Sequence, residues 1–159
     1  MTRLAAPFFV TVVAWGTLAF AAPAKDLRVE TPVARETLPG QTVGSAYLVI
    51  HNDSTVPVRL QSASSPVARD VQIHDMSLHD GVMRMRQVVD GVTIAARGKL
   101  VFESGGMHLM LVGLHAPLTA GDRIPLTLRF ERRGELTVSL RVTSIDGTFP
   151  APKTAAPKP

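Results

Sequence analysis

The sequence predicts an all-β domain, an antiparallel sandwich or barrel, and three observations support this fold class. Apolar and polar residues alternate with a period of two over residues 124–130 and again over 136–142, with Arg133-Gly134 between the runs. This alternation on both sides of a turn indicates a half-buried β-hairpin. Short runs of β-forming residues separated by turn residues recur along the chain, and no helical period of useful length is present. Such punctuation is typical of antiparallel sandwiches and barrels.

Further strands are expected in the first half of the chain. Residues 45–50 form a short apolar run that ends at the turn-prone segment 51–54. We expect residues 56–60 to be an edge strand, because Pro57 cannot donate a hydrogen bond to a neighbouring strand. Residues 71–86 have the pattern of a strand, a turn at His79-Asp80-Gly81 and a returning strand.

Residues 1–21 have the composition of a secretory signal peptide. Arg3 supplies a positive charge, residues 4–20 are almost all apolar or small, and Ala19-Phe20-Ala21 matches a signal-peptidase site. The apolar stretch is short for a membrane span, which needs about 20 residues. We therefore expect export and cleavage after Ala21, with Ala22-Pro23-Ala24 as the second choice of site.

The remaining chain fits one domain, residues 22–147, which is long enough to bury a core. Residues 148–159 are rich in Pro, Ala and Lys, and we expect them to be a disordered tail. The net charge of +4 is spread along the chain rather than clustered, so nucleic-acid binding has little support. The absence of cysteine excludes disulfides, zinc–cysteine sites, a cysteine nucleophile and a blue-copper centre, which needs a thiolate.

Histidine and methionine gather in two short segments. Because alternate residues of a strand share a face, His74 lies on the same face as Met76, and His108 on the same face as Met110. A single methionine in a strand is more often core filler than a metal ligand. Paired with imidazole, however, thioethers form a neutral, soft donor set that suits Cu(I) better than zinc, magnesium or calcium.

The order of these residues resembles the motif of the PCuAC family of periplasmic copper chaperones: His, ten residues, Met, about twenty-one residues, then His-x-Met. Ten residues separate His74 from Met85, and His108-Leu109-Met110 supplies the closing His-x-Met. Met85 and His108 are separated by twenty-two residues, one more than the family pattern. We expect the extra residue in the turn at 88–91, where insertions are tolerated. The likeness extends to Asn52 and to residues 64–68, 81–86, 105–114 and 117–122.

The resemblance implies a cupredoxin-like β-barrel that binds one Cu(I) with His74, Met85, His108 and Met110. It also implies a periplasmic, non-enzymatic role: delivery of Cu(I) to the copper site of cytochrome c oxidase, directly or through a Sco-type thioredoxin-like partner. We expect a monomer without a membrane span after signal cleavage. Some relatives carry a His/Met-rich tail that offers a second copper site, but residues 149–159 contain neither residue type.

The other histidines and methionines of the domain are weaker candidates for metal ligands. Met76 could assist the site, whereas Met83 and Met107 are expected to pack or to shield it. His79 falls in a turn and is expected to be solvated. No metal role is assigned to the remaining histidines of the domain, His51 and His115.

Three other functions remain open on the residues alone. Ser77, His74 and Asp75 are close in sequence, as in some hydrolases, but no nucleophile elbow accompanies them. A structural β-sandwich with methionine as core filler is the second alternative. A periplasmic copper store or buffer for copper tolerance is the third, and it would use the same ligands as a chaperone.

Overall fold

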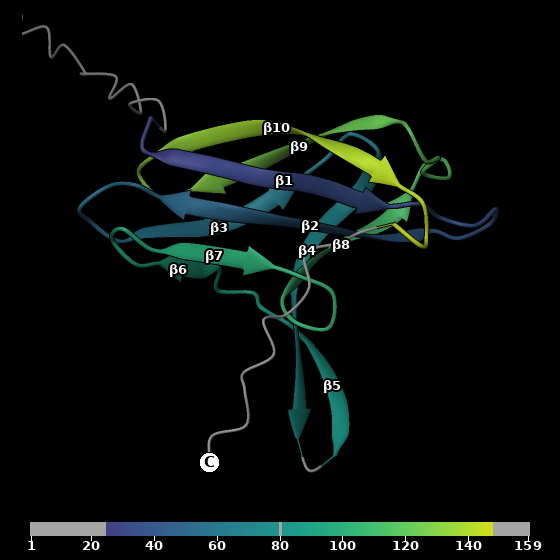
Figure 1. Cartoon of the computed structure of the whole chain (residues 1–159), viewed down its shortest axis with the longest axis horizontal. Coiled ribbons are helices and arrows are strands. Elements are labelled where there is room, and N and C mark those ends of the chain that lie inside the picture. Colours follow the sequence, from purple (N-terminus) through teal and green to yellow (C-terminus); the bar gives the residue numbers. More distant parts are fainter. Residues whose placement is uncertain (1–24, 80, 148–159) are drawn as a thin grey trace, which may run out of the picture.

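β-Strands account for all the regular secondary structure in residues 25–79 and 81–147, the part of the chain that the computed structural model describes (Figure 1). No helix in this part could span a membrane. The expected signal peptide (1–21), both cleavage sites and the expected tail (148–159) lie outside the described residues. The strands are β1 (Leu27–Arg35), β2 (Val43–Asn52), β3 (Val58–Ser64), β4 (Ala68–His79), β5 (Val82–Gln87), β6 (Val92–Ile94), β7 (Lys99–Phe102), β8 (His108–Leu114), β9 (Arg123–Phe130) and β10 (Gly134–Thr143).

Seven of these strands close into a barrel, in the order β4-β8-β2-β1-β10-β9-β3, with β3 pairing back to β4. The predicted all-β fold class is therefore confirmed. One pair departs from the expected antiparallel arrangement, because β1 and β10 run parallel. Parallel neighbours need a long connection, and here the rest of the barrel provides it. The shorter strands β6 and β7 extend the sheet beside β3 and β2.

The period-two pattern at the C-terminal end of the domain forms the predicted hairpin. β9 pairs with β10 in a continuous antiparallel ladder, from Gly134–Phe130 to Arg141–Arg123. The alternate apolar residues of β9 are buried in the core, and they are Ile124, Leu126, Leu128 and Phe130. Alternation therefore identified both the strands and their inner face.

The expectation that residues 56–60 form an edge strand is wrong. β3 begins at Val58 and pairs with β9 on one side and with β6 on the other. Pro57 lies just before the strand, so its missing N–H removes no bond from either ladder.

The predicted hairpin over residues 71–86 is present and extends beyond the barrel wall. The first half of β4 pairs with β8, whereas the second half, from His74 to His79, pairs with β5. Figure 1 shows β5 and the end of β4 protruding from the barrel. Gly81, in the turn, has a φ of 78°, which glycine adopts without steric cost. All the side chains of β5 are exposed.

Candidate metal centre

The two candidate histidine ligands lie directly opposite each other on neighbouring barrel strands. His74 of β4 pairs with His108 of β8 in the antiparallel ladder. Their ring centroids are 5.9 Å apart, and the ring planes differ by 40°. Opposite residues of an antiparallel pair project from the same face of the sheet. The ladder therefore places both imidazoles side by side on one face.

The two candidate methionine ligands flank His74 on that same face. Met110 of β8 is paired with Gln72, two residues before His74 on β4. Met85 of β5 is paired with Met76, two residues after His74. Each methionine is thus a diagonal neighbour of His74, at a Cα separation of roughly 7–8 Å that long side chains can bridge. Met110 is half-buried, whereas Met85 is 48% exposed on the hairpin.

Hydrogen bonds set the tautomer of each imidazole. His108 Nδ1 lies 3.0 Å from the carbonyl oxygen of Gly106. A carbonyl only accepts, so Nδ1 donates and the lone pair is on Nε2. His74 Nε2 lies 2.9 Å from Gln72 Oε1 and donates to it, which leaves the lone pair on Nδ1. The orientation of the Gln72 amide follows from its Nε2, which donates to Asp70 Oδ2 at 2.8 Å.

The Nδ1 atom of His74 is the most informative atom of the site. It is buried and has no hydrogen-bond partner among the described residues, whereas buried polar atoms are nearly always paired. Burial, with a smaller contribution from nearby His108, lowers the pKa of His74 and favours its neutral form. A neutral imidazole with one nitrogen oriented by a hydrogen bond and the other unpartnered is the arrangement seen in metal-ligating histidines.

The hydrogen bonds that link Asp70 to Gln72 and Gln72 to His74 were not predicted from the sequence. A signal was available, because these three polar residues alternate with apolar ones along a predicted strand and so share a face. Outer-shell groups of this kind orient metal ligands.

The other histidines and methionines take different environments. Met76 is half-buried and lies opposite Met85 on the ligand face, and Met107 packs against the hydrophobic core. Met83 is 52% exposed because β5 extends beyond the barrel, so the expectation that it packs is wrong, and the alternative that it shields the site stays a prediction. His79 pairs with Val82 beside the hairpin turn, and the side chain of His79 lies outside the part that the structure describes. The two histidines without an assigned role lie elsewhere: His51 contacts Glu30, and His115 is exposed.

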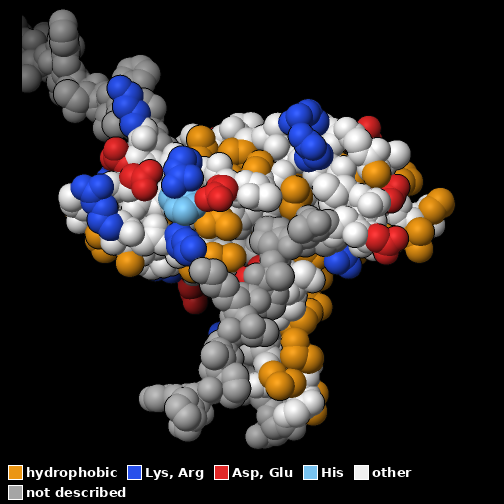
Figure 2. Space-filling model, viewed as in Figure 1, with side chains coloured by type: hydrophobic (Ala, Val, Ile, Leu, Met, Phe, Trp, Pro, Cys, Tyr) orange, Lys and Arg blue, Asp and Glu red, His pale blue; other side chains and the backbone are white. Residues whose placement is uncertain are grey.

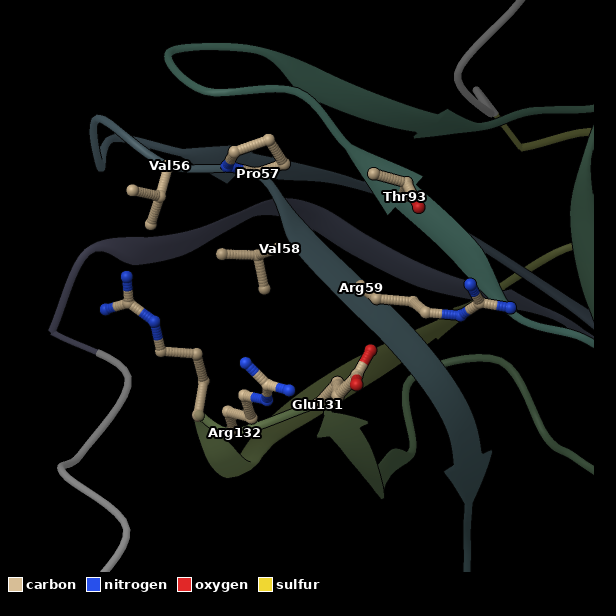
Figure 3. A pocket seen from close by; sticks show the side chains of 8 residues that line it. Val56, Pro57, Val58, Arg59, Thr93, Glu131 and Arg132 are labelled. Atoms are coloured by element: carbon tan, nitrogen blue, oxygen red, sulfur yellow. The ribbon is translucent and has the colours of Figure 1, made fainter.

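The pocket drawn in Figure 3 lies away from the site, and no cluster of acidic ligands marks the site among the described residues. The pocket in Figure 3 lies between the start of β3, β6 and the β9–β10 turn, and it contains none of the four candidate ligands. Its lining consists of Val56, Pro57, Val58, Arg59, Thr93, Glu131, Arg132 and Arg133. Within residues 25–79 and 81–147, no three His, Asp or Glu side chains gather in a metal-binding arrangement.

Fold and site together define a class of protein, a cupredoxin-like β-barrel with imidazole and thioether side chains on one face of its sheet. The chain belongs to the LpqE-like family, a PCuAC-like family whose model matches residues 27–142. The resemblance stated from the sequence is therefore confirmed at the level of the family.

Two relatives come from different organisms. A protein of Leifsonia xyli subsp. xyli that is named as a lipoprotein is 32% identical over 108 residues, which cover 68% of this chain and 65% of the relative. An uncharacterized protein of Rickettsia prowazekii is 28% identical over 116 residues, which cover 71% of this chain and 64% of that protein. The chain thus spans slightly less than two thirds of the length of either relative.

Similar solved structures include copper-bound forms. The copper-bound PCuAC domain from PmoF2 is 26% identical with a TM-score of 0.64, and the match covers 75% of this chain and 93% of that domain. The Cu(I) form of DR1885 from Deinococcus radiodurans is 28% identical with a TM-score of 0.59, over 82% of this chain and 85% of that one. The apo form of DR1885 is 27% identical with a TM-score of 0.60, over 92% and 100%.

Proposed function

We propose that this protein is a periplasmic copper chaperone. It binds one Cu(I) tightly with His74, Met85, His108 and Met110. It then delivers the ion to the copper site of cytochrome c oxidase, directly or through a Sco-type thioredoxin-like protein. The observation that carries the proposal is the buried, unpartnered Nδ1 of His74, beside His108 and between two methionines on one sheet face.

The donor set selects the metal and its oxidation state. The hydrogen bonds leave one lone pair on each imidazole, and the methionines supply neutral sulfur atoms. Neutral, soft donors suit Cu(I) and give little stabilisation to hard cations, which prefer carboxylate and carbonyl oxygens. The copper-bound PmoF2 domain and the Cu(I) form of DR1885 support the same choice.

The position of the ligands suits transfer. The histidines belong to two barrel strands, whereas Met85 lies on the protruding hairpin and is half-exposed. An acceptor can therefore approach from the Met85 side and replace ligands one at a time. Thiolates bind Cu(I) more strongly than thioethers, so an acceptor that contains cysteine can draw the ion away.

Two observations support the periplasmic assignment. Residues 1–21 have the composition of a signal peptide, and the family description refers to lipoproteins. Intact-mass measurement of the protein recovered from the periplasm tests this assignment. A mature chain that begins at Ala22 or Lys25 is expected, and retention of residues 1–21 would overturn it.

Two measurements test the binding site and the transfer. Competition titration with a Cu(I) chelator should show one tightly held ion. The double variant Met85→Leu, Met110→Leu should lower the Cu(I) affinity at least about tenfold, because the loss of an outer-shell partner alone typically costs about 10–100-fold and these residues are proposed as direct ligands. Met107→Leu is the matched control, because Met107 packs against the core. Unchanged affinity in the double variant would refute the ligand assignment.

Transfer separates a chaperone from a copper store. The Cu(I)-loaded protein should pass its ion within minutes to an apo oxidase copper domain or a Sco-type acceptor with free cysteines. If copper stays in place against the protein acceptor while a small chelator of similar affinity removes it freely, the storage function is correct instead.

A further inference from the structure

We propose that Met76, Met83 and Met85 form a second Cu(I) site, composed only of thioethers, on the β4–β5 hairpin. This site lies beside the His74 site and shares Met85 with it. The inference rests on the proposed function in one respect, that Cu(I) is the cargo of this sheet face.

The strand register brings the three thioethers together. Met76 and Met85 are directly opposite each other in the β4–β5 ladder. Met83 lies two residues before Met85 on the same strand, and therefore on the same face. Opposite Cβ atoms are roughly 4.5–5.5 Å apart, and diagonal neighbours such as Met76 and Met83 are roughly 7–8 Å apart, still within reach of long side chains. Methionine is unbranched and flexible, so three such side chains can turn their sulfur atoms toward one ion.

Among the side chains of the hairpin that the structure describes, none on the face of these methionines is charged. The charged residues within the paired part of this hairpin, Arg84, Arg86 and Asp75, occupy the alternate positions and project from the other face. There Arg86 approaches Asp75 to 4.0 Å. Figure 2 shows hydrophobic side chains along the protruding hairpin. Three neutral sulfur donors favour a soft monovalent ion, Cu(I) or its redox-inert analogue Ag(I).

Exposure distinguishes Met83 and Met85 from core filler. A methionine that serves packing is buried, as Met107 is partly buried against the core. Met83 and Met85 are 52% and 48% exposed, and every residue of β5 is exposed. A strand placed in solvent gains little from methionine as an apolar residue. Metal binding by the thioether sulfur accounts for methionine at these exposed positions, whereas packing does not.

Met85 connects the two sites. It is opposite Met76 in the ladder and is also the diagonal neighbour of His74. A Cu(I) ion captured by the exposed thioethers can therefore keep Met85 while it exchanges Met76 and Met83 for the imidazole of His74. The reverse order of exchanges carries the ion outward to an acceptor. No ligand changes its protonation state at the thioether site, because a thioether does not titrate.

Methyl NMR of the mature chain with isotope-labelled methionine tests the inference, with Ag(I) as the probe. In the variant His74→Asn, Ag(I) should shift the methyl signals of Met76, Met83 and Met85 together. The signal of Met107 serves as an internal control. In the wild type, a second and weaker equivalent of Ag(I) should follow the first.

A double methionine variant that retains both histidines tests the site independently, in case His74→Asn does not fold. Met76→Leu, Met83→Leu preserves apolar side chains of similar size and should lose the second equivalent of Ag(I), whereas Met107→Leu should keep it. If the Met76→Leu, Met83→Leu variant binds as many Ag(I) ions as the wild type, the thioether site is refuted. If only Met85 and Met110 respond in the wild type and no second equivalent of Ag(I) binds, the inference fails and the proposed function stands. If no methionine responds and no ion binds, the proposed function fails as well.

Discussion

The imidazole rings of His74 and His108 are 5.9 Å apart, and the strands that carry them are joined by a ladder that runs from Ala68–Leu114 to the histidine pair itself. Their separation is therefore set by the barrel. The ion is not needed to bring them together. We accordingly expect the apo protein to be folded, and expect copper to raise its melting temperature because the ion binds the native state. Circular dichroism of the apo protein without a native β signal would contradict this.

Acid should destabilise the apo protein through His74. Burial lowers the pKa of His74 below its ordinary value of about 6.5. The unfolded chain therefore takes up this proton at a higher pH than the folded chain. The stability associated with neutral His74 is complete above about pH 6.5 and is lost as the pH falls through the lower folded pKa.

Urea unfolding across this pH range measures the effect. The variant His74→Asn should show a weaker loss of stability on acidification than the wild type. His115→Asn serves as the control, because His115 is exposed. An identical pH dependence in the wild type and in His74→Asn would show that His74 contributes nothing to it.

Gln72 should act as a positioning residue for copper binding. Its side-chain oxygen accepts from His74 Nε2 at 2.9 Å and so keeps the lone pair on Nδ1. The variant Gln72→Leu should lower Cu(I) affinity about 10–100-fold, the usual cost of losing an outer-shell partner. Gln61→Leu is the matched control, on an exposed position of β3.

A tautomer measurement separates positioning from a general loss of structure. Imidazole nitrogen NMR should show the proton of His74 on Nε2 in the wild type and a mixture of tautomers in Gln72→Leu. If the mixture is absent while affinity still falls, Gln72 acts by some route other than the tautomer.

Asn52 should be a determinant of stability rather than of copper binding. The side chain is fully buried. Its Nδ2 donates to the carbonyls of Val56 and Ala95 at 2.9 and 3.0 Å, and its Oδ1 accepts from the Ser54 hydroxyl at 2.6 Å. Asn52→Leu removes these hydrogen bonds and leaves the Ser54 N–H, which also donates to Asn52 Oδ1 at 3.1 Å, without its acceptor, at roughly 1–3 kcal/mol for such a buried group. Denaturant unfolding measures the loss.

Copper affinity of the folded Asn52→Leu variant should be unchanged. Met110 pairs with Ser45, at the opposite end of β2 from Asn52. A fall in affinity without a fall in stability would assign Asn52 to the metal site instead.

Gly91 should tolerate no side chain. It has a φ of 72°, and a Cβ atom there would lie 2.3 Å from the carbonyl oxygen of Leu60. Gly40 has a similar φ of 83° but open space around it, so Gly40→Ala should show the backbone cost alone, roughly 1–2 kcal/mol. Gly91→Ala should lose clearly more free energy of unfolding. Equal losses in the two variants would mean that the clash is relieved by movement of the 88–91 loop.

Sequence patterns predicted what depends on neighbours along the chain. The period of two located the β9–β10 hairpin and its buried face, and the turn at 79–81 located the β4–β5 hairpin. Pairings between distant strands were missed, because no local pattern records that β1 lies parallel to β10 or that β3 has partners on both sides. The exposure of Met83 was missed for a related reason: alternation separates the two faces of a strand but does not say whether either face is covered.

The hairpin register has a consequence for recognising distant relatives. β4 pairs with β5 from His74–Gln87 to His79–Val82, so the turn alone determines how many residues separate His74 from Met85. One residue more or fewer would put the methionine on the opposite face of the sheet. Between Met85 and His108, by contrast, lie loops, β6 and β7, and β8 takes its register from β4 and β2 rather than from them. A search pattern should therefore hold the first spacing fixed and let the second vary, which is the variation that this chain shows.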